Sequence, residues 1–140
     1  MSTIKSNTFT ALTTNGDLTI TGNGTGKIKL TGAAVADIVS LTDGTSVAVN
    51  FSDGQNFSLT LAGNRTLENP TNCVAGQSGS VFVIQDGTGS RTLSFNAIYE
   101  FKDDTAPTLT TTAAKGDVFV FRYNGSKWLE MGRNTNLTLS

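Results

Sequence analysis

The chain has 140 residues, enough to bury a core without disulfides, and its single cysteine, Cys73, has no partner within it. Its charged fraction of 15% lies below the typical ~25%, its net charge is −1 and it contains no histidine. These totals argue against nucleic-acid binding and remove the commonest general base and metal ligand. Thr, Ser, Asn and Gly supply most of the polar residues, which favours strands joined by many turns.

Residues 1–35 are expected to form a β arm that is distinct from a second domain, residues 36–140. Leu18 and Ile20 alternate with polar residues, residues 22–26 are rich in glycine, and residues 27–30 alternate again, which predicts two strands and a turn. The glycine-rich segment lacks the Lys-Ser/Thr pair of a phosphate-binding loop. Because a two-stranded hairpin is marginal in water, we expect the arm to lie on the body, on a neighbouring copy or on a docking partner.

No basic segment followed by an apolar stretch opens the sequence, and no apolar run approaches the ~18 residues of a membrane span. We therefore expect neither a secretion signal nor a membrane-spanning segment. From residue 38 onward, short β-prone runs recur between Asp-Gly, Asn-Gly and other glycine-containing turns. Strands are expected at residues 38–42, 46–51, 57–61, 80–85, 91–95, 118–123 and 127–131. This spacing predicts an all-β domain, an antiparallel β-sandwich of jelly-roll type.

The run at residues 57–61 is the clearest half-buried strand. Phe57, Leu59 and Leu61 alternate with small, mostly polar residues, so they should form one wall of the core. Gly63-Asn64 predicts a tight turn after this strand.

The last hairpin has the strongest turn signal, because Asn124-Gly125 suits a type I′ turn. Its first strand is apolar on both faces, with Phe119, Phe121 and Tyr123 on one side and Val118 and Val120 on the other. Such a strand is usually central, or is covered by a second layer or subunit.

No catalytic set can be assembled from the residue types present, so we expect a protein that is not an enzyme and has no cofactor. Asp103 and Asp104 are adjacent in a segment, residues 103–107, that is typical of an exposed loop. A bound calcium ion with Asp86 and Asp117 is an alternative, but the spacing matches no EF-hand, and we expect no metal.

Three aromatic residues with polar tips, Tyr99, Tyr123 and Trp128, are the candidate contact residues. Such rings stack on sugars when they are exposed on a β-surface, and they are also ordinary residues of cores and subunit contacts. The second interpretation is preferred for each of the three.

Several segments together resemble a module of tailed-bacteriophage virion proteins, over about residues 38–132. They are Leu41-Thr42-Asp43-Gly44, residues 57–67, Asn69-Pro70-Thr71-Asn72, residues 75–79, residues 85–95, Ala106-Pro107-Thr108-Leu109 and the closing hairpin at residues 117–131. The arm, with residues 15–20 followed by residues 22–26, is similar to the openings of phage fibre and tail proteins.

The resemblance implies a homotrimer whose residues 1–35 attach to other virion proteins, and a location in the virion after synthesis in the bacterial host cytoplasm. A short tail fibre or tail accessory protein is the leading interpretation. A capsid-decoration or head-fibre protein is an alternative, and a carbohydrate-binding module that recognises host surface polysaccharide is another. Neither nucleic acid nor a membrane is expected as a partner.

Overall fold

The computed structural model describes residues 18–20, 24–25 and 29–139, and the chain divides into two compact units, Met1–Val35 and Ala36–Ser140. In the first unit, residues 18–20, 29 and 30 are not in strands, and Gly24 and Thr25 lie in a turn. The rest of the expected two-stranded arm lies outside the described residues.

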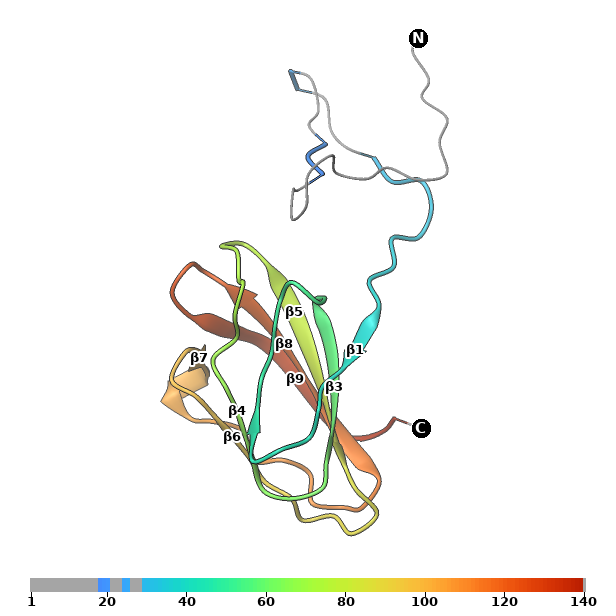
Figure 1. Cartoon of the computed structure of the whole chain (residues 1–140), viewed down its shortest axis with the longest axis vertical. Helices are drawn as coiled ribbons and strands as arrows, with labels where there is room; N and C mark the ends of the chain where they lie inside the picture. Colours follow the sequence, from blue (N-terminus) through green and yellow to red (C-terminus); the bar gives the residue numbers. More distant parts are fainter. Residues whose placement is uncertain (1–17, 21–23, 26–28, 140) are drawn as a thin grey trace. The chain divides into compact units, whose positions relative to one another are not determined.

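The described part of the second unit is all-β, with nine strands and one short 3₁₀ helix, η1 (Lys102–Asp104). The strands are β1 (Ile38–Ser40), β2 (Ser46–Val47), β3 (Asn56–Leu61), β4 (Arg65–Leu67), β5 (Ser78–Gln85), β6 (Leu93–Phe95), β7 (Tyr99–Glu100), β8 (Lys115–Tyr123) and β9 (Trp128–Thr138). They form a six-stranded sheet A in the order β1-β3-β5-β8-β9-β7 and a three-stranded sheet B in the order β2-β4-β6. Figure 1 shows β4 and β6 on one side of the unit and β1, β3, β5, β8 and β9 of sheet A on the other.

The first six strands alternate between the two sheets, so the chain winds as a coil. β1, β3 and β5 pair in parallel in sheet A, while β2, β4 and β6 pair in parallel in sheet B. Each turn of the coil therefore contributes one strand to each sheet, and its backbone pairs with the next turn. Connections run from sheet A to sheet B through three arches, residues 41–45, 62–64 and 86–92.

The stacked turns place apolar residues directly above one another. Val39 pairs with Phe57, and Phe57 with Val81, while Leu59 pairs with Val83. In sheet B, Val47 pairs with Leu67, which pairs with Phe95. The inward residues Phe57, Leu59, Leu61, Val47 and Leu67 are fully buried, so the core runs along the coil axis between the sheets.

One end of the coil is closed by the last part of the chain. β8 pairs antiparallel with β5 and β9 pairs antiparallel with β8, which extends sheet A beyond the coil. Over the third arch, the amide of Gln85 donates to the carbonyls of Arg91 (2.9 Å) and Thr110 (2.8 Å), and the N–H of Ser90 donates to Thr111 (2.8 Å). The segment that contains Thr110 therefore lies against the last turn.

The all-β, sandwich-like class is confirmed, but the expected antiparallel pairing holds only for β5, β8 and β9. The remaining pairs, including β7 with β9, are parallel. Gly63-Asn64 does not join two strands of a hairpin; it lies in an arch between the sheets, because β3 belongs to sheet A and β4 to sheet B.

The hairpin between β8 and β9 is confirmed, although its turn is not type I′. Tyr123 pairs with Trp128, so four residues separate the strands, and Gly125 (φ 101°) is the residue of the expected pair with a positive φ. The side chain of Asn124 accepts hydrogen bonds from the N–H groups of Ser126 (2.9 Å) and Lys127 (2.8 Å). This side-chain capping replaces the second left-handed residue that a two-residue turn requires.

Leu59→Ala tests the coil core, because Leu59 is fully buried in the middle turn. We expect the free energy of unfolding to fall by about 2–5 kcal/mol, from lost burial and the cavity left behind. Urea denaturation at one fixed protein concentration measures it. The control is Thr60→Ala on the exposed face of the same strand, which should change stability by no more than about 0.5 kcal/mol. Equal effects of the two substitutions would contradict the assigned faces of β3.

Candidate interaction surfaces

The arches are joined to one another by polar side chains. Arg65, at the start of β4, donates from Nε to Oδ1 of Asp43 at 2.8 Å and from Nη2 to Oδ2 at 2.6 Å, which is a bidentate pair between the first and second arches. The side-chain oxygen of Asn64 accepts from the N–H of Thr92 at 3.1 Å, which links the second arch to the third.

The third arch is held by its own ion pair. One carboxylate oxygen of Asp86 accepts from the N–H groups of Thr88 (2.9 Å) and Gly89 (2.8 Å), and the other accepts from Nη2 of Arg91 at 2.8 Å. Hydrogen bonding by Arg91 lowers the pKa of the Asp86 carboxyl, and Arg65 lowers that of Asp43 in the same way. Both carboxylates thus carry charge that is already paired within the arches.

The opposite side of the coil has a second set of links. The side-chain oxygen of Asn50 accepts from the amide of Asn72 at 2.8 Å, and the N–H of Ile98 donates to the side chain of Asn69 at 3.3 Å. The amide of Asn96 donates to the carboxylate of Glu68. These polar groups hold successive turns in register. Their hydrogen bonds are therefore explained by the fold, without a ligand.

Trp128 lies in the core and is 1% exposed. Its ring stacks on Phe51, with centroids 4.3 Å apart, and on Tyr123, with centroids 5.3 Å apart. Its indole N–H points to the sulfur of Cys73 at 3.3 Å. The ring of Trp128 therefore presents no face for a sugar in this structure. Trp128 is a core residue, which is the preferred of the two interpretations.

The two tyrosines differ from each other in exposure. Tyr99 is 7% exposed and its hydroxyl donates to the carbonyl of Glu68 at 3.2 Å, while burial raises the pKa of the Tyr99 phenol. Tyr123 is half-buried and its hydroxyl donates to Gly125 at 2.9 Å. The structure brings Tyr123 and Trp128 together, and of the three predicted residues only Tyr123 keeps part of its surface for a ligand or subunit.

Cys73 is a free, half-buried thiol. Burial raises the pKa of the Cys73 thiol, while the hydrogen bond from Trp128 acts in the opposite direction. A raised pKa leaves less thiolate at neutral pH, so this sulfur is a weak nucleophile.

Asp117 is the one buried carboxylate in the described core, 1% exposed. It accepts hydrogen bonds from the N–H of Thr110 (2.7 Å), the hydroxyl of Thr110 (2.6 Å) and the N–H of Asn136 (3.0 Å). It therefore ties the closing segment to β8 and β9. Asp86 and Asp117 have separate partners, and the described residues contain no cluster of three potential metal ligands.

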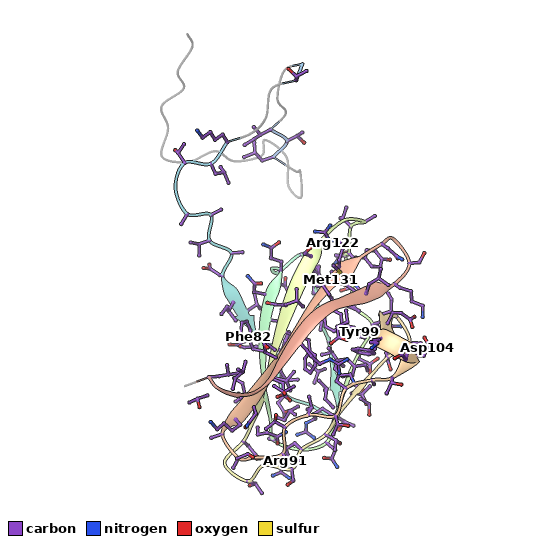
Figure 2. The ribbon with its side chains drawn as sticks, turned by 180° about the vertical axis from the view of Figure 1, so that it is seen from behind. Phe82, Arg91, Tyr99, Asp104, Arg122 and Met131 are labelled. Carbon is purple, nitrogen blue, oxygen red and sulfur yellow. The ribbon has the colours of Figure 1, made fainter. Side chains whose placement is uncertain are left out.

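The outer face of sheet A carries an apolar surface, which we call the outer patch. It consists of Ile38, Phe82, Ile84, Val118, Val120 and Met131. Phe82 pairs with Val118 across β5 and β8, and the exposed fractions of Ile38, Val120 and Met131 are 57%, 40% and 64%. Figure 2 labels Phe82 on β5 and Met131 on β9.

The outer patch is only partly visible in the sequence. The sequence predicts an apolar outer face at Val118 and Val120, because their strand is apolar on both faces. Residues 80–85 show the same pattern through Phe82 and Ile84. Met131 and Ile38 could not be assigned to this face, because a β-bulge next to Met131 and the parallel pairing of β1 are not readable from periodicity.

None of the helices in the described ranges is both long and apolar enough to cross a membrane. Comparisons of the chain with known protein families, with curated proteins and with solved structures found no match.

Asp43→Asn tests the pair between the first two arches. The pKa of Asp43 is lowered from 3.8 in the folded state, so its stabilisation is present above that pH and is lost as the pH falls through the folded pKa. We expect a lower Tm at neutral pH and a smaller loss of Tm between about pH 5 and about pH 2 than in the parent chain. Thermal unfolding followed by circular dichroism measures both. Asp53→Asn, at an exposed residue, is the control, and parallel pH profiles for all three proteins would contradict the assignment.

Asp117→Ala tests the closing segment. It leaves the N–H and the hydroxyl of Thr110 without their carboxylate acceptor, while the N–H of Asn136 keeps the Thr110 hydroxyl as an acceptor. A donor left unpaired away from water costs about 1–3 kcal/mol. We expect unfolding at lower urea and faster proteolysis within residues 105–112. Asp53→Ala, at an exposed residue, should leave both unchanged. Unaltered stability of the Asp117 variant would show that the segment is held by other contacts.

Proposed function

We propose that the chain is a non-enzymatic structural protein of a tailed-bacteriophage virion, a short tail fibre or tail accessory protein that assembles as a homotrimer. Residues 1–35 attach it to other virion proteins. The resemblance of about residues 38–132 to virion modules supports the class of protein. The observation that carries the assembly is the outer patch.

A second copy is the partner that suits the outer patch. Its six residues are uncharged, and the hollow between β1 and β5 is completed by Ser58 and Leu139. The hollow that contains Val118, Val120 and Met131 is also lined by Arg133, whose guanidinium is paired with Glu130 of the same chain. Two copies of this apolar surface meet without strong like-charge repulsion, because the lining charge is already paired. Around a three-fold axis, the same residues of three copies meet and cover one another.

The coil suits a structural role because its shape depends on backbone pairing between successive turns. Five of the six patch residues lie on β5, β8 and β9, which are central or near-central strands of sheet A, and Ile38 lies on the edge strand β1. Most of the patch is therefore displayed on a rigid surface. A tail position is proposed ahead of a head position because the arm is similar to the openings of fibre and tail proteins.

The mass in solution tests the assembly. Sedimentation equilibrium of the purified chain should give three times the chain mass of 14.7 kDa. Val120→Asp should raise the concentration at which the trimer dissociates by at least about tenfold, since burying a valine side chain contributes about 1.5–3 kcal/mol. Thr108→Asp, at an exposed loop residue, is the matched control for added charge. A monomer, or equal behaviour of both variants, would overturn the interface.

The virion assignment has its own test. Antibodies raised against the purified chain should label particles of the phage whose genome encodes it, as seen by electron microscopy. Labelled tails support the proposal, labelled heads replace it with a capsid-decoration protein, and unlabelled particles overturn a virion role.

A further inference from the structure

The coil has one open end, formed by β1 and β2. Within the described part of the chain, β1 pairs only with β3 and β2 only with β4, so both are edge strands of parallel sheets. Edge strands present unpaired backbone N–H and C=O groups to any extended segment that can reach them. The far end of the coil is closed by β8, β9 and the segment around Thr110.

A hollow of about 390 Å³ lies between the two edge strands. Its lining includes Val39, Leu41 and Ala48, together with Ser46 and Asn50. Val39 and Leu41 are only half-buried, although they occupy the first turn of the apolar stack whose next members are fully buried. The open end therefore exposes the end of the core, and a further pair of apolar side chains would continue it.

One segment of the arm matches the middle turn of the coil in sequence. The middle turn reads Leu59-Thr60-Leu61-Ala62-Gly63-Asn64-Arg65-Thr66, and the arm reads Leu18-Thr19-Ile20-Thr21-Gly22-Asn23-Gly24-Thr25. Five of these eight positions are identical, and Ile20 replaces Leu61 conservatively. Leu59 and Leu61 are fully buried, whereas Leu18 and Ile20 are 54% and 64% exposed. The arm thus carries the apolar pattern of a coil turn without the burial.

We propose that residues 18–20 of a second copy add to the open end, parallel to β1, so that Leu18 lies beside Val39 and Ile20 lies beside Leu41, which continues the apolar stack. This inference rests on the proposed homotrimer and names a contact that would hold it. Residues 30–37 are all exposed, and eight extended residues span up to about 28 Å, which is enough to reach a neighbour. Each copy gives one arm and receives one, so three copies close a ring.

Cysteine cross-linking of the full chain tests the exchange. In a Cys73→Ser background, Thr19→Cys and Ser40→Cys are placed on separate chains with different tags and co-expressed. The proposed register sets residue 19 opposite residue 40, an exposed residue of β1, at a spacing that a disulfide can bridge. Mild oxidation should join the two differently tagged chains, as seen by non-reducing electrophoresis and mass spectrometry. Thr60→Cys, exposed on β3, replaces Ser40→Cys in the matched control and should give no such product.

The outcomes separate this inference from the homotrimer itself. A trimer by sedimentation without the cross-link overturns the exchange alone, while a monomer overturns both. A chain that carries both Thr19→Cys and Ser40→Cys and closes only on itself shows that the arm covers its own coil, which also overturns the exchange. Ile20→Asp provides a second readout and should raise the dissociation concentration at least tenfold, and unchanged dissociation would count against the inference.

Discussion

Parallel, in-register stacking of successive turns is the constraint on which the second unit depends. The backbone groups of each turn form hydrogen bonds with the neighbouring turns. The side chains above and below any inward position must therefore fit the same narrow space between the sheets. Val39, Phe57 and Val81 meet this requirement in sheet A, and Val47, Leu67 and Phe95 meet it in sheet B. A shift of one residue in any turn would turn its apolar side chains outward.

Polar residues in the three arches, and in the segments that lead from sheet B back to sheet A, hold successive turns in register. Asp43 with Arg65, Asn64 with Thr92 and Asn50 with Asn72 each connect one turn to the next. Two of these three links use a neutral side-chain amide, and the third is an ion pair.

The sequence predicted where most strands lie, the inward residues of β3 and the final hairpin, because these follow from local alternation and turn residues. It did not predict parallel pairing, since alternation is the same for both directions when one face of a sheet is uncovered. Turns of unequal length also hid the repeat: Val39 to Phe57 spans 18 positions and Phe57 to Val81 spans 24. The burial of Trp128 depends on Phe51 and Tyr123, which only the fold brings together.

The two ends of the coil differ, and the difference gives the molecule a direction. At one end, the core is sealed by β8, β9 and the Asp117 contacts, which use residues of the same chain. At the other end, β1 and β2 are edge strands, and the apolar stack ends at Val39 and Leu41, which are only half-buried. A strand added to this end would find the backbone edge of β1 unpaired and the side chains of Val39 and Leu41 half-buried. The inward face of such a strand is set by these apolar residues, while its direction is not set by the parallel pairs, because β5 pairs in parallel with β3 and antiparallel with β8.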